Sequence, residues 1–274
     1  MRTKEGNIHN RHRTGFSKQV EEVIKESDIL LEILDARFME KTRNPEIEKI
    51  ARNLGKKIIY VLNKSDLVDV NLMRRNIDLG KLNPHLFFSS KSRRGSMNLK
   101  KVIKMEAKRT NKPSVHIGVI GYPNTGKSSV INFLCGRRSA KISSEAGTTR
   151  AIQRIRIAKG IYLIDTPGVV PQAEKFTINR GIEIKNAQVG ATTWDRVKDP
   201  EMIVNNLMKE NPELLEKHYG IDSNNDSEIL IENLGKKSHF LLKGNLVDEN
   251  RAAKKILRDW QEGKIMGTDF EKIK

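Results

Sequence analysis

The sequence predicts an α/β protein with a doubly wound, mostly parallel sheet, followed by a smaller all-helical domain. Three observations support this prediction. Several apolar runs rich in Ile, Val and Leu end in polar, turn-like residues, as buried parallel strands do. Amphipathic helical patterns lie between several of these runs, as expected of crossover helices. After about residue 180 the strand-like runs stop and helical periodicity continues. We therefore expect a first domain at 1–180 and a helical domain at 181–274.

The expected strands alternate with helices along the first part of the chain. Helical patterns include 16–27 and 98–109 before residue 180, and 199–220 and 250–265 after it. In open α/β sheets, ligands bind at the carboxyl ends of the strands, and the most informative residues here directly follow such runs. The five expected strands are contained in the runs 28–37, 56–66, 85–92, 114–124 and 160–168.

The composition narrows the class of protein. A chain of 274 residues has room for one full α/β domain and an appendage. Its net charge of +17 favours a polyanionic partner, although a basic surface that serves solubility is the open alternative. The single cysteine, Cys135, lies in an apolar helical pattern, which is typical of a core residue in a reducing compartment. The chain has no leader-like apolar segment and no membrane-length apolar run, so we expect a cytoplasmic monomer without membrane contact.

A phosphate-binding loop is predicted at 121–129, "GYPNTGKSS", which fits the pattern G-x-x-x-x-G-K-S between a strand and a helix. In such a loop the glycines let backbone N–H groups face the phosphates. Lys127 would reach the β and γ oxygens, and the Ser128 hydroxyl would bind Mg²⁺. An ordinary Gly-rich turn is the alternative. The expected contacts to the phosphates are Asn124, Thr125, Gly126, Lys127, Ser128 and Ser129.

Two further segments would complete the phosphate and magnesium site. Asp165 begins "DTPG" after a buried run, where its carboxylate would hold Mg²⁺ and the Gly168 N–H would meet the γ-phosphate. The polar loop 143–150 lies where a second magnesium-binding hydroxyl is needed, and we favour Thr149 over Thr148. The predicted Mg²⁺ ligands are Ser128, Thr149 and Asp165.

A guanine-binding loop is predicted at 63–66, "NKSD", after the second apolar run. The carboxylate of Asp66 can accept two hydrogen bonds from guanine, which adenine cannot offer. Asn63 would brace neighbouring loops, and the aliphatic part of Lys64 would lie along the base. On its own this pattern is weak, but a second loop after the next run adds backbone N–H groups for guanine O6. The residues of that loop are Ser89, Ser90 and Lys91.

The order of these motifs is inverted relative to the usual nucleotide switch protein, because the base loop precedes the phosphate loop. Joining the old termini and opening the chain elsewhere would preserve a site built at strand ends, so the order indicates a circular permutation. With "DARFMEKTRNPEIEKI" (35–50), "LEKHYGID" (215–222) and "KKILRDW" (254–260), the chain resembles the permuted GTPases of the YlqF/RbgA type. The resemblance implies a GTP-dependent factor that docks on ribosomal RNA, assists large-subunit assembly and leaves upon hydrolysis.

The residues for hydrolysis depart from the common pattern. Val169 follows Gly168 where many GTPases have a water-orienting Gln, and an aliphatic side chain cannot orient water. Slow intrinsic turnover, stimulated by the ribosomal subunit, is therefore expected, with Lys127 and Gly168 at the γ-phosphate. The resemblance implies a catalytic histidine near the N-terminus, which alignment assigns to His12; a solvated histidine in an RNA-contacting tail is the alternative, and His9 is the weaker candidate. By the same resemblance Asn124 would help to hold K⁺.

A basic stripe is predicted at 91–112, which carries nine Lys and Arg residues against one acid, Glu106. Lys100, Lys101, Lys104 and Lys108 fall on one side of a helix, which suits contacts to RNA phosphates, although a solvated crossover helix would look the same. Three functions stay open: a GTPase acting on the large subunit, a GTP-dependent RNA-binding scaffold with negligible hydrolysis, and a permuted GTPase serving tRNA or small-subunit maturation.

Overall fold

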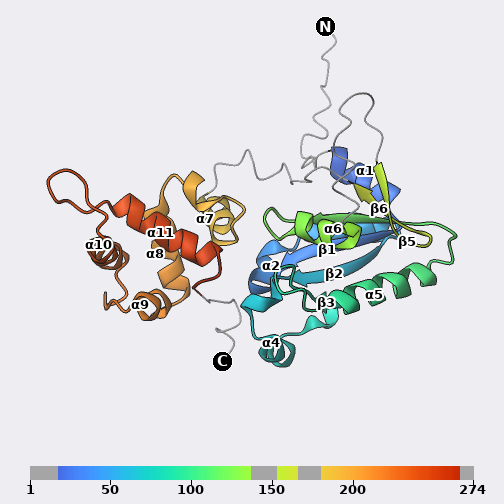
Figure 1. The fold of residues 1–274 in the computed structure, drawn as a ribbon, viewed down its shortest axis with the longest axis horizontal. Helices are drawn as coiled ribbons and strands as arrows, with labels where there is room; N and C mark the ends of the chain where they lie inside the picture. Colours follow the sequence, from blue (N-terminus) through green and yellow to red (C-terminus); the bar gives the residue numbers. More distant parts are fainter. Residues whose placement is uncertain (1–17, 137–152, 166–179, 266–274) are drawn as a thin grey trace, which may run out of the picture.

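A computed structural model describes residues 18–136, 153–165 and 180–265. Its strands form one mostly parallel sheet, as predicted (Figure 1). The register pairs Asp35 with Asn63 and Ile33 with Gly121, so three parallel strands end at the same edge. Across the sheet the order is β3 (His85–Phe87), β2 (Lys57–Asn63), β1 (Ile29–Asp35), β4 (Val115–Gly121), β6 (Ile161–Asp165) and β5 (Gln153–Ala158).

The edge strand β5 was not predicted. It pairs with β6 in the antiparallel direction, whereas β1, β2, β3, β4 and β6 run parallel. Its sequence "QRIRIA" alternates exposed Arg154 and Arg156 with the buried Ile155. An edge strand with one solvated face lacks the continuous apolar run of a buried parallel strand, which explains why this strand was missed.

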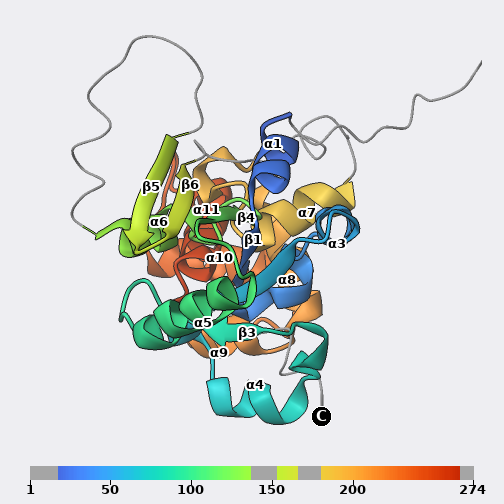
Figure 2. The same ribbon diagram turned by 90° about the vertical axis from the view of Figure 1, so that its right-hand side faces the viewer.

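Helices cover both faces of the sheet. Side chains from alternate strand positions, such as Leu30 and Leu34, pack with α1 (Lys18–Glu26), α3 (Pro45–Asn53) and α4 (Val70–Asn76) on one face. Ile29 and Leu31 point to the other face, where they pack with α5 (Ser96–Arg109) and α6 (Lys127–Cys135). Cys135 is buried there, as expected of a core residue. Figure 2 shows α3 and α5 on opposite sides of the strands. The short elements are η1 (Ala36–Phe38), α2 (Met39–Thr42), η2 (Ser65–Leu67) and η3 (Leu79–Lys81).

The chain beyond residue 180 is helical, as predicted, and has its own core. Asp199, Asp226 and Asp248 cap three of its helices, because each carboxylate accepts a backbone N–H from the first turn. The expected domain boundary at 180 adjoins 166–179, outside the described residues, and stays a prediction. The elements are α7 (Arg180–Gln188), η6 (Trp194–Arg196), α8 (Pro200–Glu210), α9 (Leu214–Tyr219), α10 (Ser227–Lys237) and α11 (Glu249–Gln261).

Phe38 and Tyr122, which follow β1 and β4, pack into the core of the helical part. The Phe38 ring lies 5.7 Å from the Trp260 ring of α11, measured between ring centroids. The carboxyl-terminal edge of the sheet therefore contacts the helical part directly. In the described part of the chain, no helix has the length and apolar character needed to cross a membrane.

Candidate nucleotide-binding site

The predicted base loop lies directly after β2. Lys64 adopts a left-handed backbone with φ of 59°, which turns the chain sharply and starts the η2 turn that carries Asp66. The Asp66 carboxylate accepts a hydrogen bond from the Ser89 hydroxyl at 2.6 Å, and Ser89 Oγ in turn accepts the Ser92 N–H at 3.0 Å. Two of the loops predicted for guanine are thus joined side chain to side chain. Ser90 is half-buried and Lys91 is exposed in the second loop.

Asn63 bridges three of the predicted motifs. Its buried side-chain amide donates to the carbonyl oxygen of Thr125 in the phosphate loop at 2.8 Å. Its Oδ1 accepts the backbone N–H of Ser90 at 3.3 Å. Gly126 is required for this contact, because a Cβ at its φ of 95° would lie 2.1 Å from Asn63 Nδ2. Asn63 therefore braces the neighbouring loops, as its sequence position leads one to expect.

The phosphate loop connects β4 to α6 in the expected strand, turn and helix arrangement. Gly121 allows a close approach to β1, since a Cβ there would lie 2.4 Å from the Ile33 carbonyl oxygen. Lys127 is half-buried, and its ammonium donates to the Tyr122 carbonyl at 2.6 Å. Burial lowers its pKa to about 8. An ammonium group destabilised in this way gains most from an anion placed beside it. Ser128 and Ser129 lie exposed in the first turn of α6, where a helix favours anions.

A buried charge cluster supports the base loop from β1. Asp35 accepts two side-chain hydrogen bonds from Arg37, at 3.1 and 2.8 Å, and one from Lys64 Nζ at 2.7 Å. Burial alone would raise the pKa of Asp35, but the charges and hydrogen bonds of Arg37 and Lys64 outweigh it and lower the pKa. Sequence reasoning assigned Lys64 only to the base and gave Asp35 and Arg37 no role beyond the resemblance. The sequence did contain an indication of this cluster, because two charged residues directly after a buried strand need partners for their charges.

Comparisons with known proteins agree with this geometry. A family model described as 50S ribosome-binding GTPase matches residues 116–233, which begin at the phosphate-loop strand and leave the base loop outside. The structure of GNP-bound YlqF from T. maritima superposes with a TM-score of 0.67 and 22% identity, covering 93% of this chain and 97% of that chain. The chain has the circularly permuted fold of the YlqF-type GTPases. The predicted inversion of motif order is thereby confirmed at the level of the fold.

Two relatives in sequence are GTP-binding proteins by name. The GTP-binding protein MJ1464 of Methanocaldococcus jannaschii is 36% identical over 252 residues, which are 90% of this chain and 65% of the relative. Nucleolar GTP-binding protein 2 of Schizosaccharomyces pombe is 33% identical over 250 residues, which are 89% of this chain and 46% of the relative. The chain therefore spans about half to two thirds of the length of these relatives.

The phosphate loop of this YlqF-type fold also contacts the helical part. The Asn124 side chain donates to the Gly190 carbonyl, and the Tyr122 hydroxyl donates to Asn186 Oδ1. Lys185 Nζ lies 4.7 Å from the centre of the Tyr122 ring. Asn124, predicted to hold K⁺, thus has a protein partner in the described structure. These contacts were not anticipated, because no short-range sequence pattern indicates which helix of the second part lies beside the phosphate loop.

Several predicted residues lie outside the described part of the YlqF-type fold. These are His12, Thr149 and Gly168, together with His9, Thr148 and Val169. Asp165 is the last residue of β6, which runs parallel to β4 and so ends at the phosphate-loop edge. Mg²⁺ is commonly held by one or two protein oxygens together with substrate phosphates, and the Ser128 hydroxyl at the start of α6 suits that role. In the described ranges, no cluster of three or more His, Cys, Asp or Glu side chains could hold a metal without the substrate.

Proposed function

We propose that the protein binds GTP and hydrolyses it as a switch in assembly of the large ribosomal subunit. The observation that carries this proposal is the Asn63 bridge, which joins the base loop to the phosphate loop and to the loop of Ser90. These loops come from distant parts of the chain and would face one nucleotide. Asp66 would read guanine, and Lys127 would neutralise the phosphates.

In this proposal Mg²⁺ is held by Ser128, Thr149 and Asp165, and it would offset charge on the β- and γ-phosphates. K⁺ beside Asn124 would add positive charge in the absence of an arginine finger. Binding K⁺ would require Asn124 to release the Gly190 carbonyl, which would connect the phosphate site to the position of the helical part. Nucleotide state would then be communicated through this contact as well as through the chain after Asp165.

Hydrolysis should be slow in the free protein, because Val169 cannot orient the attacking water. The large subunit would supply order to the site, with His12 as the candidate water-orienting group. A cytoplasmic monomer that docks on ribosomal RNA through α5 fits this scheme. Lys101, Lys104 and Lys108 are exposed on α5, while Leu99, Ile103 and Ala107 of the same helix are buried against the sheet. The names of the matching family and of the nucleolar relatives support a ribosomal partner.

Replacement of Asp66 by Asn tests base recognition. Asp66→Asn removes the acceptor for two guanine donors, so the free energy of GTP binding should weaken by several kcal/mol if the pocket excludes water. Xanthosine triphosphate should then bind to the variant better than GTP. Binding of both nucleotides is measured side by side by titration calorimetry. Equal losses for the two, or no loss for either, would contradict the assignment of Asp66 to the base.

The second candidate is a GTP-dependent RNA-binding scaffold with negligible hydrolysis, which Val169 favours. Turnover measured with and without large subunits, in K⁺ and in Na⁺, separates the two. Stimulation by subunits and by K⁺ supports the switch. Retained GTP-dependent binding to subunits with no turnover in any condition supports the scaffold. Co-sedimentation with the small subunit or tRNA, but not with the large subunit, would redirect the proposal to that substrate.

A further inference from the structure

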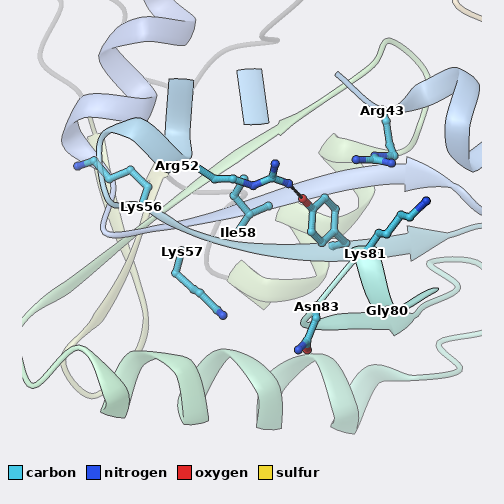
Figure 3. A pocket seen from close by; sticks show the side chains of 9 residues that line it. Arg43, Arg52, Lys56, Lys57, Ile58, Gly80, Lys81 and Asn83 are labelled. Atoms are coloured by element: carbon cyan, nitrogen blue, oxygen red, sulfur yellow. Dashed lines mark hydrogen bonds between the residues drawn. The ribbon is translucent and has the colours of Figure 1, made fainter. Parts of the chain in front are cut away.

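A concave site lies along β2, beside α3 and the η3 segment. It is a cleft of about 550 Å³, within the size range of ligand-binding pockets. One end is marked by Lys57, the first residue of β2, at the opposite end of that strand from Asn63. Among the described residues that line it, every charged one is basic. These are Arg43, Arg52, Lys56, Lys57 and Lys81 (Figure 3).

Glu48 holds two of these basic side chains in place through ion pairs. Its buried carboxylate accepts from Arg43 Nε at 2.8 Å and from Arg52 Nη2 at 2.7 Å. The Tyr60 hydroxyl donates to the same carboxylate at 3.0 Å and accepts from Arg52 at 2.9 Å. The two guanidinium groups are thereby held in fixed positions without further ordering. A fixed planar guanidinium is the group best suited to bind phosphate oxygens.

The acids near the cleft leave it positively charged. Glu48 offsets one of the five basic charges, and Glu40 offsets a second through its contact with Arg43 at 3.1 Å. Glu32 is buried on β1, where burial and then the charge of Glu48 raise its pKa to about 8. It is therefore mostly neutral at pH 7 and subtracts little charge. Asp78 offsets a third basic charge, because its carboxylate accepts the N–H of the cleft-lining Gly80 at 3.0 Å. Two positive charges therefore remain around the cleft.

Lys81 is a free cation of this site. It is exposed and has no ion pair or side-chain hydrogen bond within the ranges that the structure describes. Lys57 is also exposed, but it pairs with Ile29 in the sheet register, so its side chain extends toward the face of α5 (Figure 3). Lys56, by contrast, donates to the carbonyl oxygens of Lys25 and Ser27. A free ammonium group beside two fixed guanidinium groups suits an extended anion with several negative groups.

We propose that this cleft binds the phosphodiester backbone of an RNA strand. The inference rests on the proposed RNA-binding function and adds to it a second contact surface. The α5 stripe lies on the opposite face of the sheet, and the short strand β3 forms the edge between the two faces. Arg74 and Arg75 of α4 are also exposed near this edge, and the Arg74 guanidinium lies 5.4 Å from the centre of the Phe87 ring of β3. An RNA that crosses β3 would contact the cleft on one side and α5 on the other.

The test is the salt dependence of binding of the 274-residue chain to a defined RNA duplex. Lys81→Gln should weaken binding about threefold to tenfold at low salt. The slope of log K against log salt should also become shallower by about 0.9, because one phosphate contact is lost. The matched control is Lys159→Gln, which removes the same charge from an exposed lysine outside the cleft. This control should keep the parental slope.

Three further measurements make each outcome informative. GDP binding should be unchanged in the cleft variant, since the nucleotide loops lie at the other end of β2. Lys101→Gln with Lys104→Gln tests α5. A loss of RNA affinity in that variant but not in the cleft variant would overturn the cleft assignment and leave the proposed function intact. Equal losses of RNA affinity in the cleft and control variants would do the same. Absence of RNA and subunit binding by the parental chain would overturn both. Inorganic phosphate that displaces the RNA at equal phosphate concentration would show a simple anion site and overturn the RNA assignment.

Discussion

Two carboxyl groups on β1, those of Glu32 and Asp35, are both fully buried, but their pKa values move in opposite directions. The pKa of Glu32 is raised to about 8, first by burial and then by the charge of Glu48. Burial acts on Asp35 in the same direction, yet the pKa of Asp35 is lowered because Arg37 and Lys64 bind both of its oxygens. The difference shows that a buried acid keeps its charge here only where cationic side chains contact its carboxylate.

The carboxyl groups of Asp35 and Glu32 also differ in the elements of the fold that they connect. The Asp35 cluster joins the base loop, through Lys64, to the helical part, because Arg37 Nη1 donates to the Trp260 carbonyl at 3.1 Å across 223 residues of sequence. Glu32 has one hydrogen-bond partner, the Asn44 N–H at 3.1 Å, and its second oxygen has none among the described residues. The charged cluster therefore ties distant elements together, while the neutral acid is a local feature beneath the basic cleft.

The largest effect is expected from breaking the charged cluster. Arg37→Ala leaves Asp35 buried with Lys64 as its sole cation and removes the contact to Trp260, so the free energy of unfolding should fall by about 3 to 5 kcal/mol. Chemical denaturation at pH 7 measures it. The control variant, Asp35→Asn with Arg37→Met, leaves no carboxylate unpaired and should recover part of the loss. A loss below about 1 kcal/mol in Arg37→Ala would show that the buried pair is not needed for stability.

The comparison also shows how far the sequence alone can lead. The five apolar runs, the loops after them and the role of Asn63 as a brace depend on local pattern and on strand order, and these were predictable. The Arg37 contact to Trp260 was not, because no short-range pattern indicates which carbonyl lies beside a buried guanidinium 223 residues away. The contact between Asn124 and Gly190 was missed for the same reason. The assignments of His12, Thr149 and Gly168 stay predictions.

A smaller, pH-dependent effect on the free energy of unfolding is expected from replacing Glu32. Glu32→Gln keeps the acceptor for the Asn44 N–H but removes the ionisable group. In the parental protein the folded state holds the Glu32 proton between pH 4.5 and about 8 while the unfolded chain releases it, so this group's stabilisation is complete below pH 4.5 and is lost as pH rises to 8. The loss is on the order of a few kcal/mol.

Denaturation curves of Glu32→Gln and the parental chain at matched pH values isolate this contribution, since all other titrating groups are shared. The variant should gain stability relative to the parental chain as the pH rises from 5 to 8, while the two change in parallel above that range. A constant difference across the whole range would show that Glu32 has an ordinary pKa in the folded protein, and the contrast with Asp35 would then disappear.

The smallest effect concerns Lys127, a half-buried cation that has no counter-ion among the described residues. Its pKa is lowered to about 8 by burial alone, and the phosphates of GDP would raise it again. Binding should therefore take up a proton in mildly alkaline solution, and GDP affinity should fall by about fourfold between pH 7 and pH 8.5 through this group.

Calorimetry in buffers of different ionisation enthalpy measures the proton uptake directly. Lys127→Arg is the matched control, because a guanidinium keeps its charge throughout this range; its weaker GDP binding should show no proton uptake in mildly alkaline solution. Proton uptake of equal size in both proteins would assign the linkage to another group. Uptake in the parental chain alone would identify Lys127 as the half-buried amine that nucleotide binding protonates.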